Sequence, residues 1–261
     1  MSTPGPGRGR SRVGWRCGGI LSVLALMASA CGSGPPGPPG AGTGIVQSRP
    51  IPGSISHLAF KDQRGRSLEL SSFRGKTVLV VPFLTLCAEI CPFDTGNLLQ
   101  VEHSLMRDGS ASKVQLVELS VDPTRDTPAR LAAYAHLTGA SWELLTETPV
   151  EATEVEHFFG WDVERVPENS PPSVDWWTGK PLTYDVDHSD GFVIIDTHGA
   201  ERFSTGAAPD FHGSLNPTLH RFLSDQGLDH LAHPQTPGWN PTIALNTLGW
   251  VLQRPLPLVG G

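Results

Sequence analysis

Residues 78–92 read VLVVPFLTLCAEICP, and this stretch decides the fold. An apolar run that ends at Pro82 predicts a strand buried on both faces of a parallel or mixed sheet. Cys87 and Cys91 follow it, and Pro92 suits the first position of a helix, because the NH of that position has no partner within the helix. Both thiols are therefore expected between a strand end and a helix start, where open α/β sheets bind ligands.

The four-residue spacing of the two cysteines limits what they can do. On helical or near-helical backbone, Cys87 and Cys91 would lie on one face, one turn apart. They could close a disulfide if their Cα atoms approach to roughly 6 Å, or the reduced pair could bind one soft metal ion. Two structural interpretations compete with this chemistry: an inert disulfide, and two buried apolar thiols.

The N-terminus has the features of an export signal. Residues 1–30 contain four arginines and no acidic residue, and their apolar run is too short to span a bilayer comfortably. Small residues directly before Cys31 resemble the bacterial lipobox, although Ala28 replaces the usual leucine. This pattern predicts cleavage after residue 30 and acylation of Cys31. The alternative is an ordinary secretory signal, and either interpretation places the mature protein outside the cytoplasm.

Export simplifies the cysteine count. Cys17 lies in the predicted signal and Cys31 would carry the lipid, which leaves Cys87 and Cys91 to pair with each other or with a metal. Loss of residues 1–30 would leave 15 basic and 26 acidic residues, a formal net charge of −11. An acidic protein is unsuited to nucleic acid and to electrostatic adhesion to anionic lipid, so the acyl chain alone would link it to the membrane.

Composition divides the mature chain into three parts. Residues 31–55 are predicted to be a lipidated tether, because residues 32–44 read GSGPPGPPGAGTG and offer nothing apolar to bury. Residues 56–233 are long enough for one domain with a single core. Residues 234–261 form a tail containing proline and tryptophan, too short and interrupted for a membrane span, whose role the sequence does not define.

The central domain is predicted to be an α/β domain with a thioredoxin-like fold, in which helices flank a central mixed sheet and an N-terminal hairpin precedes it. Two alternating segments, 57–60 and 67–70, flank the turn of that hairpin. Two cysteines after the first central strand, with a hairpin and helix at the end, follow the thioredoxin order. We expect strands at 114–121, 142–145, 191–196 and 201–203, and helices at 94–108, 126–137, 150–161 and 216–223.

Three motifs sharpen this prediction. FLTLCAEICP at 83–92, SVDPTRDTP at 120–128 and VDHS at 186–189 together resemble the motifs of the Sco/SenC family, and the resemblance covers roughly residues 56–226. It implies a membrane-anchored, extracytoplasmic protein that binds copper and assists assembly of the dinuclear copper site of cytochrome c oxidase. By position, it also implies that Cys87, Cys91 and His188 are the metal ligands. Ala88 departs from the family, whose members commonly have proline there.

The donor types agree with copper. Two thiolates and one imidazole form a soft site suited to Cu⁺ or Cu²⁺, whereas zinc normally requires a fourth ligand. His188 lies just before the strand expected at Gly191, where thioredoxin-type reductases carry a cis-proline. Asp187 is either the partner that orients its imidazole or a solvated loop charge. Asp122 is expected to order a turn rather than to touch the metal.

The leading hypothesis is a lipid-anchored copper chaperone that passes its ion to a copper-bearing oxidase subunit or to another copper client. The main alternative is an enzyme, a thiol–disulfide oxidoreductase that uses Cys87 and Cys91 as a redox dithiol and does not need His188. The missing cis-proline argues against this enzyme. A peroxiredoxin-like peroxidase is disfavoured, because no Pro-x-x-x-Thr-x-x-Cys arrangement ends at Cys87.

Overall fold

The computed structural model describes residues 1–5, 7, 35–234 and 238–259. The chain divides into two units, Met1–Ser33 and Gly34–Gly261, and the second holds the helices and strands described below. Cys17, Cys31 and most of the predicted export signal lie outside the described residues. The interpretation of that signal therefore stays a prediction.

An eight-stranded mixed sheet forms the centre of the second unit, in the order β1-β10-β9-β4-β5-β6-β2-β3. β4 pairs in parallel with β5 and antiparallel with β9, which forms a hairpin with β10. This arrangement confirms the predicted thioredoxin-like fold with its mixed central sheet. The strands are β1 (Ile45–Pro50), β2 (Phe60–Asp62), β3 (Ser67–Leu68), β4 (Thr77–Phe83), β5 (Val114–Ser120), β6 (Glu143–Thr146), β9 (Phe192–Ile195) and β10 (Ala200–Thr205), with β7 (Val163–Val166) and β8 (Asp185–His188) in a separate two-stranded sheet.

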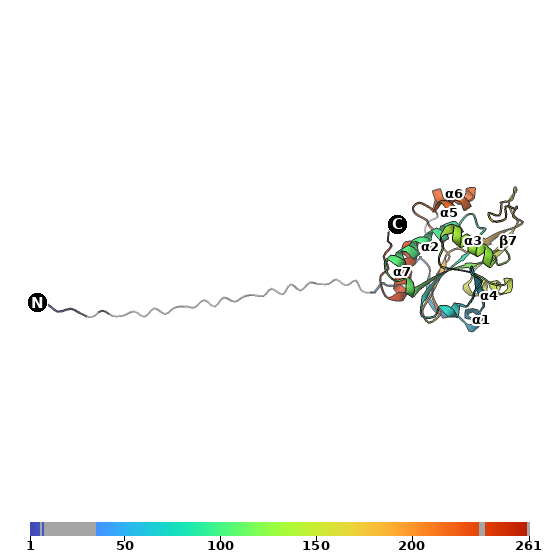
Figure 1. Cartoon of the computed structure of the whole chain (residues 1–261). Helices are drawn as coiled ribbons and strands as arrows, with labels where there is room; N and C mark the ends of the chain where they lie inside the picture. Colours follow the sequence, from blue (N-terminus) through green and yellow to red (C-terminus); the bar gives the residue numbers. More distant parts are fainter. Residues whose placement is uncertain (6, 8–34, 235–237, 260–261) are drawn as a thin grey trace. The chain divides into compact units, whose positions relative to one another are not determined.

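Helices cover both faces of the central sheet (Figure 1). α2, α3 and α7 pack on one face, and α1 and α4 pack on the other. β4 is buried along its whole length because its alternate side chains enter the two cores, with Leu79 and Val81 on the first face and Val80 on the second. The α-helices are α1 (Gly53–Ser56), α2 (Cys91–Arg107), α3 (Pro128–Thr138), α4 (Pro149–Phe159), α5 (Pro217–Phe222), α6 (Asp225–Ala232) and α7 (Pro241–Leu252), and two short 3₁₀ helices are η1 (Leu70–Phe73) and η2 (Ala111–Lys113).

The predicted N-terminal hairpin is formed by β2 and β3, which pair antiparallel. Its turn is stabilised by the buried carboxylate of Asp62, which accepts hydrogen bonds from the backbone NH groups of Arg64 (2.9 Å) and Arg66 (2.7 Å). The hairpin joins the sheet through β2, which pairs antiparallel with β6.

Two stretches outside the predicted domain are also folded. β1 lies within residues 31–55, the predicted tether, and pairs antiparallel with β10, where Arg49 forms an ion pair with the buried Glu201. Residues 238–259, within the predicted tail, contain α7, which packs against α2. Trp239, just before α7, is 1% exposed and joins the main core. The folded body therefore extends beyond residues 56–233 at both ends.

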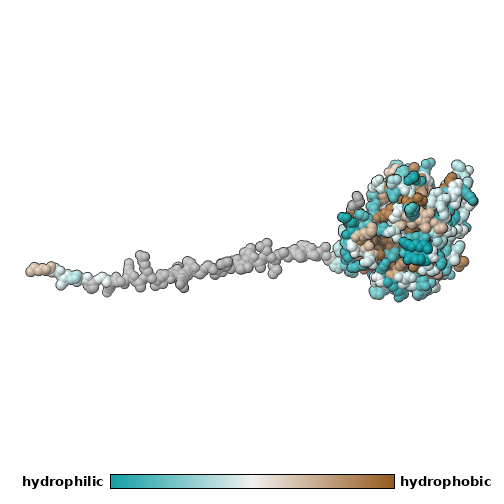
Figure 2. Space-filling view, in the orientation of Figure 1, coloured by the Kyte–Doolittle hydropathy of each residue, from teal (hydrophilic) through white to brown (hydrophobic). Residues whose placement is uncertain are grey.

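No helix of the described residues combines the length and the apolar character that crossing a bilayer requires. In the face that Figure 2 shows, hydrophobic residues of the folded unit form small groups among hydrophilic ones. Exposed large apolar side chains include Ile45, Met106, Val150 and Trp177, which come from separate parts of the chain.

Candidate metal centre

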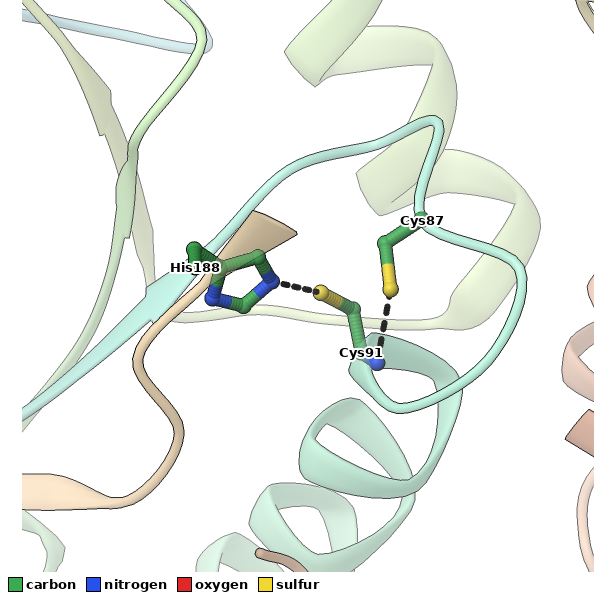
Figure 3. Close-up of side chains that lie close together, drawn as sticks. All are labelled: Cys87, Cys91 and His188. Atoms are coloured by element: carbon green, nitrogen blue, oxygen red, sulfur yellow. Dashed lines mark hydrogen bonds between the residues drawn. The ribbon is translucent and has the colours of Figure 1, made fainter. Parts of the chain in front are cut away.

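Cys87, Cys91 and His188 meet beyond the end of β4 (Figure 3). The two sulfur atoms and one imidazole nitrogen lie within 4.8 Å of one another, and the described residues hold no second cluster of this kind. Nε2 of His188 lies 3.4 Å from Sγ of Cys91. The structure therefore brings together the three side chains that the sequence singled out.

Residues 84–91, which we call the dithiol corner, carry the chain from β4 into α2. The backbone NH of Cys87 donates to the carbonyl of Leu84 (3.2 Å), and the NH of Cys91 donates to Sγ of Cys87 (3.4 Å). Pro92 is the second residue of α2, one position later than predicted, and still lies in the first turn. Cys91 is buried beneath the half-buried Cys87, and both are free thiols. Residues close in sequence therefore bring both sulfurs to the start of α2.

The two thiols differ in acidity. The hydrogen bond from the thiol of Cys91 lowers the pKa of Cys87 well below its usual value, against the effect of burial, and His188 adds to the lowering. Burial and the neighbouring Cys87 raise the pKa of Cys91 well above its usual value. Burial would lower the pKa of His188, but the hydrogen bond and the charge of Cys87 outweigh it and raise this pKa. A metal that binds both sulfurs must therefore displace the proton of Cys91.

Residues 163–188, which we call the histidine arm, comprise β7, β8 and the loop between them. His188 ends β8 and pairs with Val163 of β7. Its Nδ1 lies 2.9 Å from the backbone carbonyl oxygen of Ser189. Because a carbonyl only accepts, Nδ1 carries the hydrogen, and in the neutral ring Nε2 presents its lone pair to the sulfurs. The side chain of Asp187 is exposed. It is therefore a solvated charge and not the partner that orients the imidazole of His188.

The second sequence motif holds the arm where β8 begins. Arg125 forms an ion pair with the buried carboxylate of Asp122, and its Nη1 donates to the backbone carbonyl of Tyr184 (2.8 Å). The hydroxyl of Tyr184 donates to Asp122 (3.0 Å), and the Arg125 guanidinium lies 3.9 Å from the centre of the Tyr184 ring. Asp122 orders its turn, as expected, and also fixes the residue that precedes β8. Sequence reasoning missed Tyr184, because nothing near it marks this contact.

A buried ion pair holds the loop of the arm. Arg130 of α3 and Asp175 are each 6% exposed and form two hydrogen bonds, Nη1–Oδ1 at 2.9 Å and Nη2–Oδ2 at 2.7 Å. Burial would raise the pKa of Asp175, but the Arg130 guanidinium and nearby backbone NH groups lower it overall. The next residue, Trp176, donates its indole NH to the carbonyl of Thr85 (2.7 Å), which joins the arm to the dithiol corner. Trp176 therefore packs on the body, whereas Trp177 is 43% exposed.

Carboxylates surround the centre. A cavity of about 570 Å³ opens beside His188, and Asp162, Glu164 and Asp187 also line it. On the other side, burial and the charge of Cys87 raise the pKa of Glu89 to about 7. None of these four carboxylates forms an ion pair within the part of the chain that the structure describes. The unpaired negative charge of Asp162, Glu164 and Asp187 at this opening favours the approach of a cation.

Comparisons with known proteins all point to one family. The sequence profile of the SCO1/SenC family matches residues 53–207. The protein SCO2 homolog, mitochondrial, of Homo sapiens is 30% identical over 138 residues, which cover 53% of this chain and 48% of the human protein. The SCO1 protein homolog of Bacillus subtilis (strain 168) is 28% identical over 180 residues, 67% of this chain and 82% of that protein. The chain thus spans about half the length of its human relative.

A solved structure also resembles the folded unit. The structure described as Bradyrhizobium japonicum ScoI with copper bound is 24% identical, and the match covers 72% of this chain and 99% of that chain with a TM-score of 0.47. The copper in that description belongs to the Bradyrhizobium protein. For the present chain, the choice of metal depends on its own ligand atoms.

Proposed function

Because the chain belongs to the SCO1/SenC family, we propose that it is an extracytoplasmic copper chaperone. Cys87, Cys91 and His188 hold one copper ion as cargo, and a copper-bearing subunit of cytochrome c oxidase or another copper client receives it. The observation that carries the proposal is the convergence of two sulfurs and one imidazole nitrogen within 4.8 Å. The hydrogen bond that Nδ1 donates to the carbonyl of Ser189 supports the proposal, because the lone pair of Nε2 is then available to bind the metal.

The chemistry of the donor set favours copper over other ions. Two thiolates and one imidazole suit Cu⁺ or Cu²⁺ and are poor ligands for magnesium or calcium. Zinc accepts the same donors but completes a structural site with a fourth ligand, and the cluster contains three. Three ligands, one of them the half-buried Cys87, leave a side from which a client's thiolate can approach and exchange ligands.

Copper titration of the purified mature protein tests this function. We expect Cys87→Ser and Cys91→Ser to weaken Cu⁺ binding by more than about 100-fold, because removing a ligand lowers metal affinity more than removing an outer-shell partner does. His188→Ala is expected to weaken binding of Cu²⁺ by at least about 10-fold. His198→Ala removes an exposed imidazole at the β9–β10 turn and should change nothing. Full-strength binding in all three ligand variants would rule the assignment out.

A second function, thiol–disulfide exchange with a client, is favoured by one observation. The more exposed Cys87 lies over the buried Cys91, as an attacking and a resolving thiol would. This function needs both cysteines but not His188. Reduction of a client's disulfide that survives His188→Ala while copper binding is lost would favour the oxidoreductase.

We further propose that Cys31 carries a lipid and anchors the protein on the extracytoplasmic side of the cell membrane. The support is the lipobox-like sequence before Cys31. Labelling with a fatty acid analogue in a bacterial host should tag the wild-type chain and not Cys31→Ser. The variant should also leave the membrane fraction. Equal labelling of both chains would contradict the anchor.

A further inference from the structure

Helix α6 lies directly against the loop between the two cysteines. Its N-cap residue, Ser224, donates its backbone NH to the carbonyl of Ala88 at 2.8 Å. Gly227, in the first turn of α6, lies so close that a Cβ there would be 2.5 Å from the Ala88 oxygen and 3.3 Å from Cα of Glu89. The backbone of the helix therefore touches the backbone of the loop.

The loop has few other restraints. Among the described residues, the bond from Ser224 is the one backbone hydrogen bond that Ala88 or Glu89 makes. Cys91 is held at the start of α2, and Cys87 is held on its N-terminal side through Leu84. On the C-terminal side of Cys87, the contact with α6 is what fixes the chain.

The segment that leads into α6 is held on the start of α2 by a small hydrophobic core, whose edge includes Leu231 of α6. Phe93, two residues after Cys91, packs there against the segment that leads into α5, and the two rings of Phe93 and Phe211 stack at 6.3 Å. Gly96 of α2 allows this close approach, since a Cβ there would lie 2.8 Å from the Phe211 ring. The buried members of this core are Phe93, Phe211, Leu215 and Leu219, with Leu223 and Leu231 at its edge.

We propose that α6 is a clamp that positions Cys87 relative to Cys91 and His188 and thereby sets the metal affinity of the centre. The inference rests on the proposed copper function. Ser224 and Gly227 are positioning residues, because they contact the loop and not the ligand atoms. A loop already held in place loses less conformational freedom when both sulfurs engage one ion, so binding is tighter. The clamp lies beyond residues 53–207, the range that the family profile matches.

Gly227→Ala tests the clamp by inserting a methyl group between the helix and the loop. Something must shift, because the nearest neighbour of the new Cβ is a backbone oxygen. We expect about 10-fold weaker copper binding, the scale of losing an outer-shell partner. We also expect faster hydrogen exchange in a peptide covering residues 84–93, with β4 unchanged. Gly53→Ala is the matched control, since it lies in the first turn of α1 and its Cβ would meet only a side-chain atom of His57 at 3.5 Å.

Ser224 supplies a second pair of variants if Gly227→Ala does not fold. Ser224→Pro removes the NH that Ala88 accepts, and the φ of −71° at this residue suits proline. Ser224→Ala keeps that NH, and both variants lose the side-chain cap of α6, a 3.1 Å bond from the NH of Gly227. We therefore expect the proline variant to bind copper several-fold more weakly than the alanine variant.

The outcomes separate the clamp from the proposed function. If the wild type binds copper and Gly227→Ala and both Ser224 variants bind it equally well, the clamp is overturned and the copper function stands. If the wild type does not bind copper, the proposed function fails, and hydrogen exchange of residues 84–93 decides the clamp. Exchange in Gly227→Ala that matches the Gly53→Ala control then overturns it.

Discussion

The dithiol corner and the histidine arm deliver ligands to the same point, but they are held in different ways. The corner is local: a buried strand, two backbone hydrogen bonds and a helix start place Cys87 and Cys91 within a few residues. The arm belongs to a separate two-stranded sheet and depends on side chains from distant segments to place His188. Substitutions in α3 and in the second motif should therefore loosen the imidazole, whereas the sulfur pair depends on the corner and on α6.

The two regions are joined at Thr85. Its carbonyl accepts the indole NH of Trp176 from the arm, and its backbone NH donates to Asp126 at 3.1 Å. Asp126 and Arg125 belong to the same motif, so one stretch of sequence contacts both the corner and the arm. Substitutions that disturb the arm should therefore lower the overall stability as well as the metal affinity.

The largest effect is expected from Asp175→Asn, which breaks the buried pair with Arg130. Removing one partner of a buried ion pair leaves an uncompensated charge and costs about 3–5 kcal/mol. We expect a loss of unfolding free energy of about 3 kcal/mol in urea titrations. Asp229→Asn is the control, because its ion pair with His233 is exposed and should be worth less than about 1 kcal/mol. Equal stability of the two variants would contradict the role of the pair.

The same pair gives the arm a defined response to pH. The pKa of Asp175 is lowered in the folded protein, so its contribution is present above the ordinary carboxylate pKa and disappears as the pH falls through the folded value. The wild type should therefore lose this stabilisation on acidification, and Asp175→Asn should show a flatter profile on the acid side. If stability fell equally steeply on acidification in both proteins, Asp175 would not be the source of this pH response.

Glu118, buried in β5 beneath α2, behaves in the opposite way. It accepts hydrogen bonds from Thr95 (2.7 Å) and the indole of Trp142 (2.9 Å), yet burial raises its pKa to about 7. Because folding raises this pKa, the contribution of Glu118 to stability is fully present below the pKa that it has in the unfolded chain. That contribution is lost as the pH rises through about 7. Between pH 5 and 8, Glu118→Gln should therefore lose less stability than the wild type, by about 3 kcal/mol at most.

Unfolding measured at several pH values in both proteins checks this prediction. Other buried carboxylates with raised pKa values, such as Asp94 and Asp126, make the wild-type profile steep on their own. The difference between the two proteins isolates Glu118. A constant difference across the range would show that this carboxyl does not titrate there.

The corner could be predicted from the sequence because its signals are local. An apolar run and the proline after Cys91 mark a strand and a helix start, and both elements appear there. The arm could not be predicted, because β7 and β8 read VERV and DVDH, four residues each with charges at half of the positions. The sequence singled out His188, but its hydrogen-bond partner is a backbone carbonyl, which no residue type announces.

Tertiary packing also explains what was missed at the chain ends. β1 carries few apolar residues and is held by its pairing with β10, so a composition-based boundary placed it in the tether. The sequence of the proline-containing tail predicts no role for it, although Asn240 caps α7 by accepting from the NH of Ile243 at 3.1 Å. That cap and the burial of Trp239 depend on packing against the main core, which the local sequence does not indicate.

The smallest effect is expected from Tyr184→Phe, which tests whether the arm acts on the metal through His188 alone. The substitution removes the hydrogen bond to Asp122, worth about 1 kcal/mol, and leaves the ring under the Arg125 guanidinium. We expect copper affinity to fall a few-fold in the wild-type background. In a His188→Ala background the same change should have no effect on affinity, because the ring it positions is gone. A loss of equal size in both backgrounds would mean that Tyr184 acts on the sulfurs, and that the corner and the arm are one unit rather than two.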